Sequence, residues 1–269
     1  MSSHVSTRRK SLRALSVGAA VVSVAGLSMA GANAAPQNPA QLNSSIASHE
    51  SHALHGARGH NTTTEASNWS GYAATGGSGA YKSVSSSWVQ PAVSCTSQNT
   101  YSSFWVGIDG YSQSDNGLEQ TGTEADCING RATYGAWWEV LPAAESAYSV
   151  TVKPGDHLKA TVTNDGNGQY TMTLADSTEG WTKTTHHAGS QGVNGSSAEV
   201  IAEATQVNGQ IAALSNFGTV NFSGSTANGS TLPGSSDEIV MENFDTGSVK
   251  AQPSALSAGA FSDTWRNYN

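Results

Sequence analysis

Apolar and polar residues alternate with a period of two along much of this chain. The alternation runs through residues 158–162 and again through 170–174, on either side of a turn of Asn, Asp and Gly at 164–168. Because successive side chains of a strand point to opposite faces, this pattern predicts a β-hairpin. A Pro-Gly turn at 154–156 predicts a further connection, between a strand at 148–152 and the strand that starts at 157.

Short runs of the same kind occur through the rest of the sequence. They predict strands at Ser83–Val89, Ser103–Ile108, 132–141, 197–204 and 218–222. No segment has a long apolar period of 3.6 residues, although 211–217 would fit one short helical turn. Residues 223–269 alternate weakly, so we expect them to add strands without predicting where. Many short strands and Gly-rich turns without intervening helices predict an all-β fold, an antiparallel β-sandwich.

Three of these strands pair an apolar face with a second face that carries carboxylates. The second face holds Trp105 and Asp109 in the first strand, Trp137 and Glu139 in the second, and Glu199 and Glu203 in the third. A sheet curved around a peptide or a glycan would present such a face. The alternative is that these carboxylates are solvated and that the tryptophans pack loosely.

The N-terminal residues have the layout of a signal peptide at 1–34. Basic residues at 8–13 precede an apolar run at 15–29, and Ala32-Asn33-Ala34 supplies the small residues of a cleavage site. The apolar run is too short to span a bilayer, and no second stretch of spanning length occurs after it. The sequence therefore predicts a secreted, extracellular protein without a membrane partner, exported by the general or by the twin-arginine route.

Residues 35–66 differ in composition from the C-terminal remainder of the chain. They are rich in Ala, Ser and Asn, contain four histidines and are nearly free of aromatic residues, so they cannot bury enough apolar surface to fold alone. They are either a disordered linker or a pro-segment removed after export. In the second case, protonation of the histidines near pH 6.5 would help to release the segment. We expect a single domain at 67–269.

The predicted domain is acidic and has few candidate catalytic groups other than carboxylates. Residues 67–269 hold 7 Lys and Arg against 18 Asp and Glu, a net charge of −11, which makes nucleic acid an improbable partner. Cys95 and Cys127 are expected to pair in an exported chain. The sequence lacks a G-x-S-x-G elbow and an H-E-x-x-H motif. Any catalysis should therefore use carboxylates, and we expect no metal site.

Six short motifs, in order along the chain, carry a resemblance to one enzyme family. They are N-W-S-G-Y at 68–72, W-V-G-I-D-G at 105–110, L-E-Q-T-G at 118–122, A-W-W-E at 136–139, A-E-V-I-A-E at 198–203 and F-G-T-V at 217–220. In all six the chain resembles the G1 glutamic peptidases, or eqolisins. The resemblance implies a jelly-roll-like sandwich of two large, bent antiparallel sheets. It also implies peptidase activity on protein or peptide substrates, without a metal or organic cofactor, and we expect a monomer.

The resemblance also assigns roles to individual residues. Gln120 and Glu203 would be the catalytic pair. Residues expected at substrate-binding positions of the cleft are Trp69, Trp105, Asp109, Glu124, Trp137 and Glu139. Glu199 is either a supporting residue of the same site or a solvated carboxylate.

The match to the family is uneven. Glu124 stands where the fungal enzymes commonly have Asp, and Ala204 where they have an acid. These departures leave the substrate preference open.

Two other functions compete with the peptidase. The spacing Glu199-x-Ile201-x-Glu203 faintly resembles a strand of jelly-roll glucanases, which favours a glycoside hydrolase. Retaining hydrolysis, however, needs two carboxyl groups about 5–5.5 Å apart. A non-catalytic sandwich that binds carbohydrate or protein is the other alternative.

Overall fold

The computed structural model describes residues 47–48, 54–55, 63–112 and 117–269, all within one compact unit, Gln37–Asn269. The predicted signal peptide, and most of the predicted linker or pro-segment, lie outside these residues. Every regular element in the described part is a β-strand. None of the described residues forms a helix that could cross a membrane.

The strands succeed one another with short connections. In chain order they are β1 (Ala47–Ser48), β2 (Leu54–His55), β3 (Thr63–Ala66), β4 (Trp69–Thr75), β5 (Ser83–Val89), β6 (Ser103–Ile108), β7 (Glu119–Ile128), β8 (Arg131–Val140), β9 (Ser146–Ala147), β10 (His157–Gly166), β11 (Gln169–Asp176), β12 (Trp181–Ala188), β13 (Ser197–Glu203), β14 (Gln206–Val207), β15 (Gln210–Ile211), β16 (Thr219–Ala227), β17 (Ser230–Thr231), β18 (Asp237–Asn243), β19 (Ser248–Pro253) and β20 (Phe261–Trp265).

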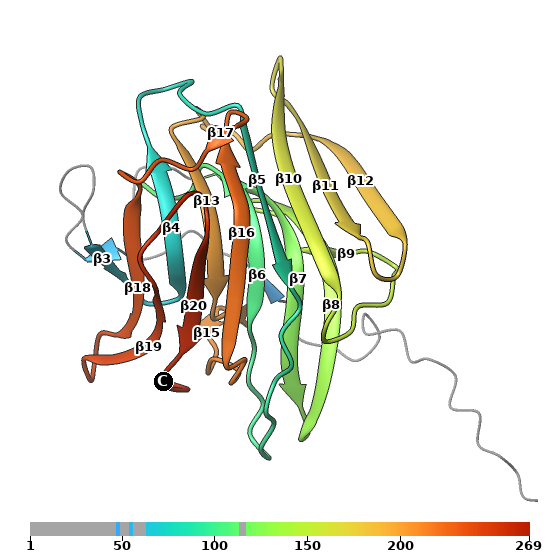
Figure 1. Cartoon of the computed structure of the whole chain (residues 1–269), viewed down its shortest axis with the longest axis vertical. Coiled ribbons are helices and arrows are strands. Elements are labelled where there is room, and N and C mark those ends of the chain that lie inside the picture. Colours follow the sequence, from blue (N-terminus) through green and yellow to red (C-terminus); the bar gives the residue numbers. More distant parts are fainter. Residues whose placement is uncertain (1–46, 49–53, 56–62, 113–116) are drawn as a thin grey trace, which may run out of the picture. The chain divides into compact units, whose positions relative to one another are not determined.

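The long strands form two antiparallel sheets that share a corner. The first sheet has the order β9-β8-β7-β6-β13-β4-β18. The second has the order β12-β11-β10-β5-β16-β20-β19, and Figure 1 shows β16, β5, β10, β11 and β12 side by side. β18 joins the two sheets, because it pairs with β4 near its start and with β19 near its end. The all-β sandwich predicted from the alternation is confirmed.

The main core lies between the two sheets. Phe104, Val106 and Ile108 of β6 belong to it, together with side chains from the second sheet such as Leu158 and Met172. The opposite face of the first sheet carries a second buried cluster: Ala66, Trp69, Ala73, Trp105, Tyr111, Leu118, Trp137, Leu141, Ile201 and Ile239. The predicted division of side chains between the two faces is therefore correct. Both faces of the first sheet are buried, which a period-two pattern alone does not reveal.

Two predicted local elements are wrong. Residues 148–152 are irregular rather than a strand: β9 ends at Ala147, and Tyr148 donates its N–H to the Ala136 carbonyl of β8 without continuing the ladder. Residues 211–217 contain no helical turn, because their backbone N–H groups bond to distant segments. Ala212 donates to the carbonyl of Thr205, and Leu214 donates to that of Tyr268. Tertiary pairing overrides the local tendency at both places.

The ordered β structure begins before residue 67. β3 pairs in parallel with β18, and β2 pairs with β3. Thr64 and Ala66 are buried, and the Thr64 hydroxyl lies 3.3 Å from that of Tyr111. β3 is thus part of the first sheet, although its sequence, Thr-Thr-Glu-Ala, has no apolar alternation that could have predicted it.

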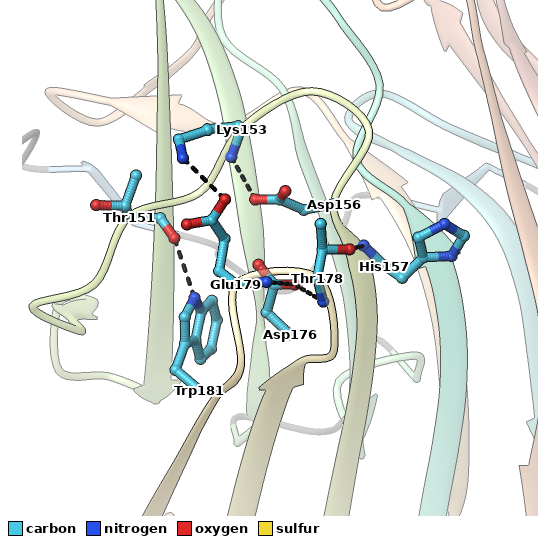
Figure 2. Close-up of polar contacts among 8 residues, drawn as sticks. All are labelled: Thr151, Lys153, Asp156, His157, Asp176, Thr178, Glu179 and Trp181. Atoms are coloured by element: carbon cyan, nitrogen blue, oxygen red, sulfur yellow. Dashed lines mark hydrogen bonds and ion pairs between the residues drawn. The ribbon is translucent and has the colours of Figure 1, made fainter.

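The predicted turn at 154–156 is present and is bound to the turn between β11 and β12 (Figure 2). Lys153 Nζ lies 2.8 Å from Glu179 Oε1, and the Lys153 backbone N–H donates to Asp156 Oδ2. Asp176 accepts two backbone N–H groups of the turn that comes after it. Burial raises the pKa of Asp156, and the neighbouring Asp176 carboxylate adds to the rise. Elsewhere, the predicted disulfide between Cys95 and Cys127 is confirmed.

Candidate active site

Five adjacent strands of the first sheet, β4, β13, β6, β7 and β8, bring most of the predicted site residues onto one buried face. One cross-strand row, which we call the Gln120 row, consists of Ala73, Glu199, Gly107, Gln120 and Glu139. A second row contains Trp69, Glu203, Ser103, Glu124 and Gly135. Trp105 lies on β6 between the two rows, with Ile201 and Gly122 as its cross-strand neighbours.

Glu203 is held at both of its carboxylate oxygens. The indole N–H of Trp105 donates to Oε2 over 2.7 Å, and the side-chain amide of Asn68 donates to Oε1 over 3.3 Å. Trp69, directly opposite Glu203 on β4, packs edge-on against Trp105 with ring centroids 4.8 Å apart. Two donors and two packed rings therefore fix the position of the carboxylate. Asn68 opens the N-W-S-G-Y motif but was given no role from the sequence.

Gln120 is held by its cross-strand neighbour. Its Nε2 donates to Glu139 Oε2 over 2.8 Å, and both side chains are fully buried. On its other side lies Gly107, where an added Cβ would come within 3.3 Å of Gln120 Cβ and 2.9 Å of Trp105 Cζ3. The Trp105 ring thus extends from its N–H at Glu203 to the space above Gly107, beside Gln120.

Asp109 holds a loop at the end of β6. Its carboxylate accepts the backbone N–H groups of Asn194, Gly195 and Ser196 over 2.8–3.1 Å. Its φ of 68° lies in the left-handed region, which residues other than Gly seldom adopt. These contacts give Asp109 a structural task, and its predicted contact with substrate stays a prediction.

Glu119 faces away from the Gln120 side chain, as the alternation along β7 predicts. Its Oε1 accepts the backbone N–H of Ser190 over 2.7 Å. Burial raises the pKa of Glu119 to about 7, while the hydrogen bonds from Ser190 oppose the rise and the charge of Asp109 adds to it. Asp109 and Glu119 together hold both ends of the loop at 190–196.

Glu124 lies at the margin of the site. An added Cβ on Gly135, its partner on β8, would come within 2.3 Å of Glu124 Oε1, so the carboxyl group lies over that glycine. The glycine therefore gives room to the longer acid that replaces the usual Asp at this position. This pairing depends on the register of β7 and β8, which the sequence alone does not fix.

The site face is buried among the described residues. Seven of the predicted residues have no exposed surface, and Trp137 has 1%; the seven are Trp69, Trp105, Asp109, Gln120, Glu139, Glu199 and Glu203. The alternative of solvated carboxylates and loosely packed tryptophans is therefore wrong. Among the described residues, no group of three or more His, Cys, Asp or Glu side chains is arranged to hold a metal ion.

Comparison with known proteins identifies what this arrangement resembles. The profile of the Peptidase A4 family matches residues 67–262. Scytalido-glutamic peptidase with a peptide-based transition-state analogue superposes with a TM-score of 0.64 and 24% identity, covering 74% of this chain and 98% of that chain. Aspergilloglutamic peptidase from Aspergillus niger superposes with a TM-score of 0.55 and 30% identity, covering 62% and 99%.

A third solved structure is similar over the same extent. It is SCP-B, a member of the eqolisin family of peptidases, in complex with the tripeptide Ala-Ile-His, with a TM-score of 0.59, 22% identity and coverage of 74% and 98%. No curated protein matches the chain.

Proposed function

Since the chain belongs to the Peptidase A4 family and is a glutamic peptidase of family G1, we propose that it is a secreted acid endopeptidase with Gln120 and Glu203 as its catalytic dyad. The observation that carries the proposal is the setting of Glu203. Its carboxylate is buried and receives one hydrogen bond at each oxygen, from Trp105 and Asn68. Gln120 lies on the same face, on the far side of the Trp105 ring.

The dyad supports hydrolysis by a water molecule. Glu203, in its ionised form, takes a proton from the water, whose oxygen forms a bond to the scissile carbonyl carbon. The Gln120 amide donates a hydrogen bond to the oxyanion that develops on the carbonyl oxygen. Glu203 then passes the proton to the amide nitrogen as the C–N bond breaks, which leaves a carboxylic acid and an amine.

A side-chain amide suits the role of Gln120, as the partner of Glu203, at acid pH. Its N–H groups remain donors at any pH, whereas a second carboxyl group would compete for the proton. The solved relatives favour a peptide substrate, because one holds a peptide-based transition-state analogue and another a tripeptide. We propose that the enzyme acts on proteins or peptides as a monomer.

The burial of the site supports the assignment of residues 35–66 as a pro-segment. A substrate cannot reach Gln120 or Glu203 until some part of the chain moves, because neither has exposed surface. Two pieces of the segment pair with the domain. β1 pairs with β14, which begins soon after Glu203, and β3, which lies within residues 35–66 and carries β2 beside it, pairs with β18. We propose that export removes residues 1–34 and that removal of the pro-segment then opens the site.

One assay separates this function from the alternatives. Purified protein, before and after incubation in acid, is mixed with a denatured protein substrate, with and without a metal chelator. We expect cleavage after acid incubation that the chelator does not inhibit, and N-terminal sequencing should show a shortened chain. Glycan release, or retention on a polysaccharide without cleavage, would favour a glycosidase or a binding protein instead.

A further inference from the structure

The two ends of the Gln120 side chain are chemically different, and the dyad needs them in one order. One end is an acceptor oxygen and the other carries two N–H donors. A half-turn of the amide exchanges them with little change in shape, so packing alone cannot select the orientation. We propose that Glu139 is the positioning residue that selects it, an inference that rests on the catalytic role proposed for Gln120.

Glu139, when ionised, can select the orientation because a carboxylate only accepts hydrogen bonds. It lies directly opposite Gln120 in the β7–β8 register, and its Oε2 is 2.8 Å from Gln120 Nε2. The flipped amide would set its oxygen against Glu139, two acceptors in contact in a buried place. Burying an acceptor without its donor is costly, so the flipped state is disfavoured.

The selected orientation directs the reacting end of Gln120 toward Glu203. In the proposed orientation, the amide oxygen and the second N–H serve the side of β7 opposite to β8. β6 and then β13, the strand of Glu203, lie on that other side of β7. An oxygen that accepts from the water and an N–H that donates to the oxyanion are what the proposed mechanism requires.

The Gln120 row also contains a competing acceptor. Glu199, on the far side of Gly107, is the other carboxylate of the row and is fully buried. Without Glu139, that carboxylate would attract the N–H end of Gln120 toward β13 and turn the amide round. Gly107 adds no side chain that could block the turn.

The test compares two substitutions of Glu139 with a control. Glu139→Met has a similar size and offers no comparable acceptor, whereas Glu139→Gln retains one acceptor oxygen but no charge. A hydrogen bond to a charged group corresponds to about a 10- to 100-fold effect. We therefore expect kcat on a peptide to fall by about that factor in Glu139→Met and by less in Glu139→Gln, with KM nearly unchanged. The control, Glu242→Gln on β18, should leave both constants unchanged.

A second measurement observes the amide directly and does not depend on activity. In a ¹⁵N spectrum, the Gln120 side-chain signal is identified by its loss in Gln120→Ala. One of its two protons should be shifted downfield by the bond to Glu139, and this shift should disappear in Glu139→Met.

Three outcomes would overturn the proposal. The first is a wild-type kcat in Glu139→Met. The second is a raised KM with unchanged kcat, which would mean that Glu139 contacts the substrate. The third is a Gln120 amide signal that the substitution does not move. Failure of the proposed function would look different, because the mature wild-type protein would then cleave no peptide at all. In that case Glu139 has no positioning role in catalysis either, whatever the Gln120 amide signal shows.

Discussion

Replacing Asp263 by Asn should make the protein less sensitive to neutral pH. Asp263 lies on β20 with no exposed surface, and among the described residues neither carboxyl oxygen has a hydrogen-bond partner. Burial raises its pKa from 3.8 to about 7; the nearby Ser70 hydroxyl, Thr264 N–H and Arg266 charge lower it, and Glu238 raises it. The folded protein therefore retains a proton on Asp263 that the unfolded chain releases at much lower pH.

The sign and size of the effect come from this difference. Below the pKa that Asp263 has in the unfolded chain, its carboxyl group is protonated in both states, so it does not change the free energy of unfolding. As the pH rises toward the pKa that Asp263 has in the folded protein, only the unfolded state is stabilised by losing this proton. The free energy of unfolding therefore falls. A difference of about 3 pKa units corresponds to roughly 4 kcal/mol lost by the time the pH exceeds 7. That is a large part of the stability of an ordinary domain.

The assay is urea unfolding of the wild type and of Asp263→Asn at several values between about pH 4 and pH 8. We expect the free energy of unfolding to fall with pH in the wild type, and to fall by several kcal/mol less in the variant. Glu119, with a pKa also raised to about 7 by burial, should retain part of the slope. The control is Asp245→Asn, at an exposed carboxylate. Equal slopes in wild type and Asp263→Asn would refute the reasoning.

Three further substitutions probe the site and its loop. Trp105→Phe removes the indole N–H that holds Glu203, so kcat should fall about 10- to 100-fold with a smaller change in KM; steady-state kinetics with unchanged kcat would contradict this. Asp109→Ala leaves three loop N–H groups, including that of Asn194, without their acceptor, and should lower the free energy of unfolding by about 3 kcal/mol or more; an unchanged urea midpoint would show that the loop does not need it. Trp137→Ala should raise KM more than it lowers kcat, and a loss confined to kcat would argue against its role in a subsite.

Local alternation was sufficient to predict which side chains share a face. The faces of β6, β8 and β13 are correct because a strand alternates its side chains whatever it pairs with. The same reasoning placed Glu119 away from Gln120. The motif resemblance then supplied the candidate dyad, which the patterning alone did not provide.

Features that depend on register could not be read from the sequence. The bond between Gln120 and Glu139, and the position of Glu124 over Gly135, exist only because β7 and β8 pair as they do. β3 was missed because its burial comes from pairing with β18, far along the chain. The irregular path of residues 148–152 is likewise not apparent from the alternation; there the Tyr148 hydroxyl and the Thr151 carbonyl contact β12.

The dyad itself is tested most directly by kcat of Glu203→Gln in the mature enzyme at acid pH. The substitution preserves shape and removes the base that takes the proton from water. With the same far-UV circular dichroism as the wild type, the variant should lose about 10³-fold or more in kcat. Activity within tenfold of the wild type would contradict the assignment of Glu203 and, with it, the proposed mechanism.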